Sequence, residues 1–473
     1  MNRIVINEQD LTTNKSSSEI TDIVYIPGFA SADATASVGD PKICYSLSQF
    51  RSYFGSAAPT FRDTQYFPYF HSAVVEGETV TYPGFPQVAI PLDSTDTEDY
   101  STVEMFARDD SDPSSLADPS YIYAASLLSK GLTIIYERMN EVTDPSSENY
   151  DVTVARAYTR LAEIYSNDID SPILDKGNYD IKYMTSGGYP THEYQTEDGL
   201  ILSNLMITCA ETRGDCVALI DHTDNPHRPL EGTGSVIAST LPNSSYGAMF
   251  TPWCNCTNGR SMPASYVYLA ALANSIKYNP SWATVAGVSR GLSDVVNSTH
   301  TDKPLSNRIA ESYQYGYTLG SSDPQICINA ITHIRPYGYV IWGNRTLRSY
   351  TTTQTGFALT FLNLRNLVSQ VKKQAYVTAQ LVMFEVNNDV LWTRFKSELT
   401  PLLDSMVSSF GLTQYKLLKV TSPDKTKLQC QIILYPTYGV ESVNISIVLT
   451  DEDLSVVLTN ESTSPVSTSG GVQ

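Results

Sequence analysis

Strand-like and helix-like hydrophobic patterns alternate along most of the first 300 residues. Short apolar runs predict buried strands, and the stretch 179–190 predicts a strand followed by a glycine turn. The predicted strands lie at 22–29, 42–45, 132–138 and 216–221, and helical spacing predicts helices at 46–55, 119–130, 152–166 and 199–213. Strands and helices in this order favour an α/β core.

The last third of the chain predicts helices followed by strands, which favours an α+β domain. Asn388 is placed to cap a helix that runs to Phe410, with Gly411 as its terminator and Pro401 as a kink. The other predicted elements are a helix at 361–375 and strands at 381–386, 428–436, 443–449 and 454–458.

Residues 58–118 differ in texture from the rest, with aromatic and proline-rich turns followed by an acidic run. Between Asp93 and Asp118 there are nine acidic residues and a single base, Arg108. Such a run is solvated. We therefore predict an inserted β-rich domain that points outward.

Overall charge narrows the range of partners. The 473 residues hold 31 Lys and Arg against 50 Asp and Glu, a net charge of −19. Phosphate binding over a whole surface needs a cationic face, so we expect no nucleic-acid partner. No apolar run approaches the roughly 18 residues of a membrane helix, and the first residues predict no secretion signal. The 31 tyrosines hint at extensive interfaces.

One window reverses the overall charge. Residues 324–384 contain no acidic residue and six cations: Arg335, Arg345, Arg348, Arg365, Lys372 and Lys373. Arg365 and Lys372 are seven residues apart, so they share one flank of the predicted helix 361–375. Three interpretations remain open for this flank: a solvated face, a docking face for an acidic partner, and a phosphate site.

Motifs for catalysis or metal binding are weak. Gly287–Gly291 fits the Gly-x-Ser-x-Gly elbow around Ser289, but a helix rather than a strand is predicted before it. The stretch 221–227 groups Asp and His side chains, yet it also fits an ordinary turn. The seven cysteines are scattered and odd in number, which favours buried free thiols over disulfides or a zinc site. Six Asn-X-Ser/Thr sequons are present, and without a predicted signal we expect them to be unmodified.

A stretch within the cationic window supplies the most specific signal. Tyr337–Leu347 reads YGYVIWGNRTL and resembles the signature of contractile tail sheath proteins. The segments FLNLRNLVSQV, VMFEVNNDVLWTRFKSELTPLLDSM and VNISIVL follow it in that family's order, and upstream segments such as VYIPGFA and DCVALIDHT resemble the family too. The resemblance spans most of the chain and is loosest at 58–118.

The resemblance implies a structural protein rather than an enzyme, with no cofactor, no metal and no direct insertion into a membrane. Sheath subunits form stacked hexameric rings in a six-start helix around a tail tube. Contraction of this helix drives the tube through a bacterial envelope. The implied partners are further copies of the chain, the tube protein, and baseplate and terminator proteins. The implied location is a virion tail that is assembled in the host cytoplasm.

The resemblance also implies roles for particular residues. Terminal arms add strands to neighbouring subunits, and the strand-prone residues of these arms are Arg3, Ile4, Val5, Ile6, Leu454, Ser455, Val456, Val457 and Leu458. We expect the C-terminal domain to face the tube, with Arg365, Lys372 and Lys373 docking an acidic tube surface.

The predicted fold class is therefore multidomain α/β and α+β, with a mixed-sheet core and a C-terminal domain completed by strands from neighbours. The predicted parts are an arm at 1–20, a core at 21–57 and 119–324, an insertion at 58–118, a tube-facing domain at 325–450 and a tail at 451–473.

Three alternative functions stay open. The chain could belong to a related injection or bacteriocin-like particle, act as a serine hydrolase through Ser289, or be a secreted tyrosine-rich surface protein.

Overall fold

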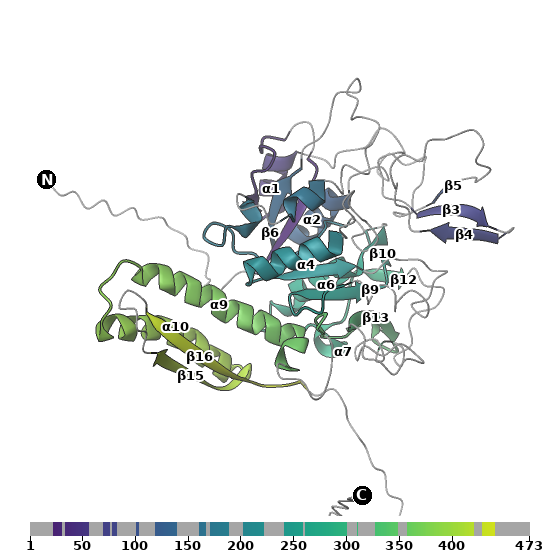
Figure 1. Cartoon of the computed structure of the whole chain (residues 1–473). Helices are drawn as coiled ribbons and strands as arrows, with labels where there is room; N and C mark the ends of the chain where they lie inside the picture. The colour runs from purple at the N-terminus through teal and green to yellow at the C-terminus, as the bar shows by residue number, and fades with distance from the viewer. Residues whose placement is uncertain are drawn as a thin grey trace, which may run out of the picture. The chain divides into compact units, whose positions relative to one another are not determined.

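A mixed eight-stranded sheet forms the centre of the computed structural model (Figure 1), with the strand order β14-β13-β9-β8-β7-β1-β6-β2. The structure describes residues 22–30, 34–55, 70–75, 78–82, 101–103, 119–139, 160–166, 171–188, 202–221, 241–258, 261–299, 310, 327–348, 357–420 and 428–439. The strands of this sheet are β1 (Ile23–Gly28), β2 (Lys42–Cys44), β6 (Thr133–Arg138), β7 (Tyr183–Met184), β8 (Val217–Asp221), β9 (Gly247–Thr251), β13 (Ile328–Ile334) and β14 (Gly338–Trp342).

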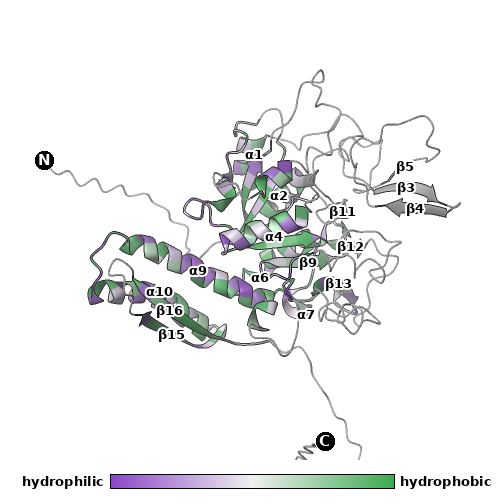
Figure 2. Ribbon diagram, viewed as in Figure 1, coloured by the Kyte–Doolittle hydropathy of each residue, from purple (hydrophilic) through white to green (hydrophobic). Residues whose placement is uncertain are grey.

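Six of these strands run parallel to one another, whereas β2 and β14 pair antiparallel at the two edges. Every residue of β1, β8 and β9 is buried. Parallel sheets are covered on both faces, so their strands are continuously apolar instead of alternating. The central strands accordingly carry the hydrophobic colour in Figure 2.

Helices cover both faces of the sheet. On one face, α1 (Leu47–Phe54), α2 (Pro119–Ser129) and α6 (Ala264–Ser275) pack against one set of strand side chains. On the other face, α4 (Leu202–Arg213) packs against the alternate set. The α/β core predicted from the alternating pattern is therefore confirmed.

The local signals at α1 act as predicted. Ser46 caps its first turn through the Gln49 backbone N–H, at 3.3 Å. Gly55 ends the helix with a φ of 97°, a conformation that glycine adopts at little cost.

The C-terminal part of the described chain contains two long helices and a two-stranded hairpin. These elements are α9 (Leu362–Val382), α10 (Asp389–Ser408), β15 (Leu412–Val420) and β16 (Gln429–Pro436). Leu367, Val371 and Leu403 form one small core between them, and Val382, Phe395 and Leu399 form a second one. Asn388 caps α10 as predicted, because its side-chain oxygen accepts from the Leu391 N–H at 2.9 Å.

Two smaller sheets and several short elements complete the described chain. A three-stranded sheet is made by β10 (Cys254–Cys256), β11 (Ser261–Met262) and β12 (Val296–Thr299), and another by β3 (Phe70–Val75), β4 (Glu78–Tyr82) and β5 (Ser101–Val103). The second sheet lies within residues 58–118; that these residues form a β-rich inserted domain that points outward stays a prediction. The short elements are α7 (Gly287–Arg290) and the 3-10 turns η3 (Pro172–Leu174) and η4 (Phe357–Thr360).

Two local predictions in the C-terminal part are wrong, and one strand was missed. The predicted strand 381–386 does not form, because α9 continues to Val382, whose side chain packs in the core beside Phe395. The strand β15 was not predicted. Gly411 is not the residue that turns the chain after α10, because Phe410 takes the left-handed conformation with a φ of 62°.

The predicted domain boundary near 325 is also wrong as a division of the fold. Strands β13 and β14 belong to the central sheet, where β13 pairs with β9. The α+β part of the chain therefore begins after them, close to α9.

Some predicted elements fall on residues that the structure does not describe. The arm at 1–20 and the strands at 443–449 and 454–458 lie outside the described residues. Among the helices that the structure does describe, none is long and apolar enough to cross a membrane.

Candidate functional site

The sequence signature folds into the junction between the central sheet and α9. Asn329 on β13 is fully buried and holds the segment that follows β14. Its Oδ1 accepts from the Arg345 N–H at 2.7 Å, and its Nδ2 donates to the carbonyl oxygens of Arg345 at 2.8 Å and Met249 at 3.1 Å. A Cβ at Gly343 would lie 2.7 Å from Asn329 Oδ1, so a residue with a side chain does not fit there without a shift. The glycine and arginine of the signature thus serve one packing arrangement.

Arg345 then fixes the beginning of α9. Its guanidinium is buried, lies 4.3 Å from the centre of the Phe361 ring, and donates to Thr360 Oγ1 at 3.2 Å. The backbone continues this contact, since the Thr346 N–H donates to the Thr360 carbonyl at 2.9 Å. The Leu347 N–H bonds the Gly247 carbonyl at 2.8 Å on β9. One short segment therefore ties the sheet to the helix.

Asn344 and Asn363 add further hydrogen bonds between this segment and the first turn of α9. Asn344 Nδ2 donates to Asn363 Oδ1 at 2.7 Å, and Asn344 Oδ1 accepts from the Asn363 N–H at 3.2 Å. The Leu362 N–H also donates to the Asn344 carbonyl at 3.0 Å. These bonds satisfy donors at the N-terminus of the helix, which have no partner within it.

Arg365, the first of the three cations predicted to dock a tube, is buried, with 2% of its surface exposed. Its guanidinium carbon lies 4.1 Å from the centre of the Tyr246 ring, and its N–H groups donate to Ser245 Oγ and Ser369 Oγ, each at 3.4 Å. Burial lowers the pKa of Arg365, and the neighbouring Tyr246 opposes this effect. The cation–π contact with Tyr246 holds this flank of α9 against the core.

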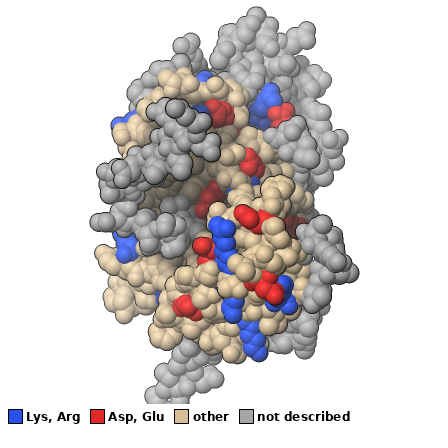
Figure 3. Space-filling model, turned by 90° about the vertical axis from the view of Figure 1, so that its left-hand side faces the viewer, with Lys and Arg blue, Asp and Glu red and all other residues tan. Residues whose placement is uncertain are grey.

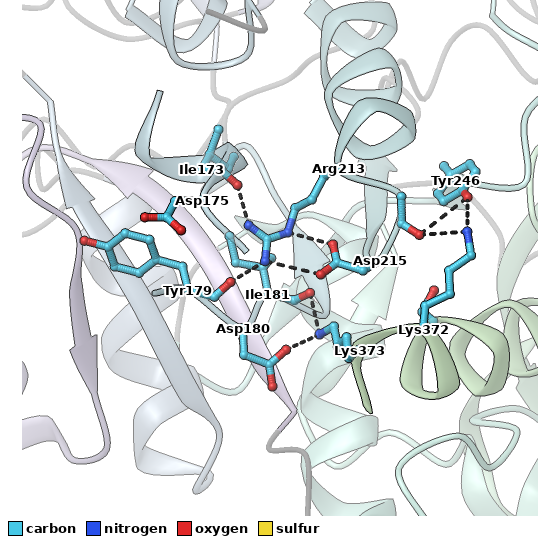
Figure 4. A network of polar contacts seen from close by, with 12 residues as sticks. Ile173, Asp175, Tyr179, Asp180, Ile181, Arg213, Asp215, Tyr246, Lys372 and Lys373 are labelled. Carbon is cyan, nitrogen blue, oxygen red and sulfur yellow. Dashed lines mark hydrogen bonds and ion pairs between the residues drawn. The ribbon is translucent and has the colours of Figure 1, made fainter. Parts of the chain in front are cut away.

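Lys373 is the second buried cation of the helix, with 9% of its surface exposed. Its Nζ donates to the Ile181 carbonyl at 2.7 Å and forms an ion pair with Asp180 (Figure 4). Lys372 is exposed, but its Nζ also reaches back to the core, 2.8 Å from Tyr246 Oη and 3.1 Å from the Gly214 carbonyl.

These positions correct the prediction of an exposed cationic docking face. The seven-residue spacing correctly placed Arg365 and Lys372 on one flank, because both contact the ring of Tyr246. That flank faces the chain's own core, and Lys373 points to the core as well. Arg365 and Lys373 are therefore not available to an outside partner while α9 keeps this position.

The core side of the junction contains an arginine that the sequence analysis did not single out. Arg213, at the end of α4, is buried and pairs with Asp215, with Nε 2.7 Å from Oδ1. It also donates to the carbonyls of Ile173 and Tyr179 (Figure 4). Arg213 thereby fixes the loop 171–182, which supplies both partners of Lys373. The pattern Thr-Arg-Gly-Asp at a helix end was the available signal.

A chain of hydroxyls passes from α9 through the sheet. Asn366 Nδ2 donates to Tyr183 Oη at 2.6 Å, and Tyr183 Oη lies 2.8 Å from Tyr268 Oη on α6. All three side chains are buried. These hydrogen bonds connect α9 to the central sheet and, through it, to α6.

Asp221, the last residue of β8, caps the start of α6. Its two carboxylate oxygens accept from the Ser265 N–H and Ser265 Oγ, each at 2.7 Å. Burial raises the pKa of Asp221 to about 7, and the two bonds from Ser265 act in the opposite direction. Asp221 thus has a structural role in the described structure; the rest of the candidate metal stretch 221–227 lies outside the described residues.

The structure does not support the serine-elbow interpretation. Ser289 is exposed on the four-residue α7, and Ala286 before it is extended without belonging to any strand. The stretch 276–286 between α6 and α7 contains no strand, whereas the nucleophile elbow needs a strand that runs into the serine.

The cysteines are all free, and all except the half-buried Cys430 are buried. Burial raises the pKa of the Cys44, Cys209 and Cys256 thiols to about 12, so these groups are protonated and unreactive near neutral pH. Within the described ranges, no three His, Cys, Asp or Glu side chains are placed to hold a metal ion.

Comparison with known proteins shows which proteins have a similar sequence or fold. No family model matches the chain. A tail sheath protein of Vibrio phage KVP40 is 25% identical over 178 residues, which cover 36% of this chain and 24% of that protein. The chain thus matches about a quarter of the length of this curated relative.

Solved structures match over nearly the whole chain. The sheath complex of the extracellular contractile injection system PVC, in the contracted state, covers 96% of this chain and 100% of its own, with a TM-score of 0.54 and 12% identity. A chain of the anti-feeding prophage baseplate covers 95% of this chain and 99% of its own, with a TM-score of 0.54 and 12% identity. The helical sheath of the anti-feeding prophage gives a TM-score of 0.50 at 14% identity, and covers 95% of this chain and 99% of its own.

The chain therefore has a fold similar to that of contractile sheath proteins. The resemblance to the contractile tail sheath proteins that the sequence predicted is confirmed. The matched proteins are structural components of phage tails and injection systems.

Proposed function

We propose that the chain is the structural subunit of a contractile sheath. Copies of it polymerise as hexameric rings in a six-start helix around a tail tube, and contraction drives the tube through a bacterial envelope. The observation that carries this proposal is the fold, which matches a contracted sheath complex over 96% of the chain. The work of contraction comes from two packings of one sequence, which needs no nucleotide and no catalytic residue.

Strand exchange between copies connects the polymer in this proposal. Within residues 357–420 and 428–439, β15 and β16 pair only with each other, so the hairpin offers two free backbone edges. Free edges accept added strands. The donors we propose are the strand-prone segments 3–6 and 454–458, which lie outside the described residues.

The tube contact remains part of the proposal, but with a changed assignment. Because Arg365 and Lys373 hold α9 to the core, they are not the tube-facing residues of this arrangement. Lys372 keeps an exposed side chain on the same helix. The other proposed partners are baseplate and terminator proteins, and the proposed location is a tail or tail-like particle built in the host cytoplasm.

A second candidate is the sheath of an injection particle that is not a phage tail. The observation that favours it is the match to the sheath of an extracellular contractile injection system and to the anti-feeding prophage. Both candidates are sheath subunits, and they differ only in the particle to which the sheath belongs.

Electron microscopy of the full chain tests the proposed function. We expect the purified chain to form hollow cylinders with six-fold symmetry in negative stain, alone or on co-expressed tube protein. A chain that lacks residues 1–20 should fold and stay in short rings or single copies. Single copies of the complete chain at every concentration would contradict the proposal.

A further inference from the structure

Four charged side chains lie together where β1 begins and where α9 contacts the residues before β7. They are Asp22, Asp180, Lys182 and Lys373. On the face shown in Figure 3, acidic and basic side chains lie at the surface among uncharged residues. Asp22, Lys182 and Lys373 are buried instead, each with less than a tenth of its surface exposed. Buried charges are costly unless they are paired, so the stability of this cluster depends on all of its members.

Lys182 ties the beginning of β1 to the rest of the fold. Its Nζ forms an ion pair with Asp22 and donates to the Ser281 carbonyl. Its backbone N–H donates to the Ile23 carbonyl at 2.8 Å. Asp22 is the first described residue, so Lys182 holds the point at which residues 1–21 join the described fold.

The same segment of chain holds α9. Lys373 bonds the two residues that precede Lys182, because its Nζ donates to the Ile181 carbonyl at 2.7 Å and forms an ion pair with Asp180 (Figure 4). Neighbouring residues of one segment thus hold two buried ammonium groups, each with its own carboxylate. Burial lowers the pKa of Lys182, Asp22 opposes this effect, and the neighbouring ammonium of Lys373 adds to it. The two lysines therefore repel each other, and the carboxylates offset this repulsion.

Two further contacts join the beginning of β1 to the C-terminal part. Tyr183, the residue after Lys182, accepts from Asn366 Nδ2 on α9 at 2.6 Å. Trp282 follows Ser281, whose carbonyl Lys182 bonds, and packs against the small core that α9 shares with α10 and β15. Each of these contacts lies one residue away from Lys182 or from its carbonyl partner. A change at Lys182 therefore reaches α9 by short routes.

We propose that these four charges couple the point where residues 1–21 join the fold to the position of α9. A displacement of Asp22 leaves Lys182 without its anion, and Lys182 then repels Lys373 and loosens α9 from the core. The helix α9 carries β15 and β16 with it, because they share two small cores. The inference rests on the proposed function, in which a segment before Asp22 donates a strand and the hairpin of β15 and β16 accepts one. Donating and accepting a strand are then coupled within one copy, and the coupling acts equally in both directions.

Amide hydrogen exchange of the full chain, below the concentration of assembly, tests the coupling. Asp22→Asn keeps the size of the side chain and removes the anion, so the buried ammonium of Lys182 is left facing Lys373. We expect the exchange rates of the amides in residues 366–374 of α9 to rise at least about tenfold, because removing one partner of a buried ion pair is strongly destabilising. The amides of α6 should keep their rates. A rise confined to β1, or one that is equal in α6 and α9, would overturn the proposal.

A matched ion pair nearer the surface gives the control. Asp40 pairs with Lys42 at 2.6 Å, and both side chains are partly exposed. Asp40→Asn should leave the exchange of α9 unchanged, because exposed pairs contribute little. A response of α9 as large as that to Asp22→Asn would be an effect of net charge and would contradict the coupling.

A second variant decides the matter if Asp22→Asn alone does not fold. Adding Lys182→Met removes the unpaired ammonium, and removing both charges of a buried pair costs far less than removing one. We expect Asp22→Asn with Lys182→Met to fold and to protect α9 as the unmodified chain does. Failure of this variant to fold, or faster exchange of its α9, would mean that the charge of Lys182 is not the link.

The coupling and the proposed function can fail separately. If α9 does not respond to Asp22→Asn, the coupling is wrong and the sheath function stands, because electron microscopy measures polymer formation independently. If the unmodified chain never polymerises, the sheath function is wrong, and the exchange of α9 still decides whether the four charges couple.

Discussion

The two ends of α9 differ in which side chains they bury. At the end near the signature, Arg365 and Lys373 are buried against the core, and Asn366 joins a chain of buried hydroxyls. At the far end, Leu381 is exposed, and Phe384 follows in the turn with its whole side chain in solvent. One helix thus buries charges at one end and exposes apolar groups at the other, the reverse of the usual preference at both ends.

This difference shows which end of α9 finds contact partners within a single copy of the chain. Lys373 has its carbonyl and carboxylate partners within the chain, so its charge is satisfied in a single copy. The apolar far end gains nothing from its exposure. Under the proposed function, a sheath subunit needs an internal junction that keeps its geometry, and the near end of α9 has the contacts for this role.

The most damaging change to the near end is predicted for Asn329→Ala. The substitution removes the side-chain partner of the Arg345 N–H and of two backbone carbonyls in a buried site. Each buried polar group that loses its partner costs about 1–3 kcal/mol, so the three groups together should lower the free energy of unfolding by at least about 3 kcal/mol. Urea denaturation of the full chain measures it.

A matched asparagine provides the control. Asn178 donates to Asp175 Oδ2 at 2.6 Å on the surface, and Asn178→Ala should cost below about 1 kcal/mol. Equal losses for the two variants would show that the signature junction is not a tightly coupled site.

The sequence predicted most of the fold because strong local signals agree with the tertiary structure. The continuous apolar runs of β1 and β8 and the cap of α10 at Asn388 are examples. The sequence did not predict where α9 ends, because Leu-Val-Met-Phe-Glu-Val is as suitable for a strand as for a helix. Packing of Val382 in the core beside Phe395 decides the matter, and Phe395 belongs to the next helix, outside the six-residue pattern.

The sequence indicated which residues form the candidate site, but not which way their side chains face. The signature correctly marked Gly343 and Arg345 as special, and spacing correctly put Arg365 and Lys372 on one flank. A cation count cannot tell which side a flank faces. That depends on Tyr246, which is more than a hundred residues away in sequence and supplies the aromatic surface that accepts both cations.

Changing the pH should alter the stability of the fold through Asp221, which caps α6. The pKa of Asp221 is about 7 in the folded chain against an ordinary value of 3.8, because burial disfavours the carboxylate. Between these values the folded state binds more protons than the unfolded state, so stability falls as pH rises from about 4 to about 7. The slope from this group is at most about 1.4 kcal/mol per pH unit.

Asp221→Asn tests this assignment, because asparagine can still accept from the Ser265 N–H and does not titrate. We expect the variant to lose part of the decline in unfolding free energy between pH 4 and pH 7, as followed by thermal melts across that range. An unchanged decline would mean that other groups cause it.

A smaller effect distinguishes two adjacent lysines of α9. Lys373→Met removes a buried ammonium that bonds the Ile181 carbonyl, and Asp180 is left partly solvated, so we expect a loss of about 1–2 kcal/mol. Lys372→Met removes exposed bonds to Tyr246 and Gly214, and should cost below about 1 kcal/mol. Chemical denaturation of the two variants side by side gives the difference. A larger loss for Lys372 would reverse the assignment of which lysine carries the junction.

The smallest effect is predicted at the far end, where Phe384→Gly should leave the single copy as stable as before or slightly more so. The left-handed conformation costs phenylalanine about 1–2 kcal/mol, which glycine avoids. Glycine has more backbone freedom in the unfolded chain, and this offsets about 1 kcal/mol of the gain. The expected change in the free energy of unfolding, measured below the concentration of assembly, is therefore a gain of less than about 1 kcal/mol. Phe410→Gly should gain less, because a fifth of the Phe410 surface is buried. A clear loss for Phe384→Gly would mean that its ring already packs within one copy, and the contrast between the two ends of α9 would disappear.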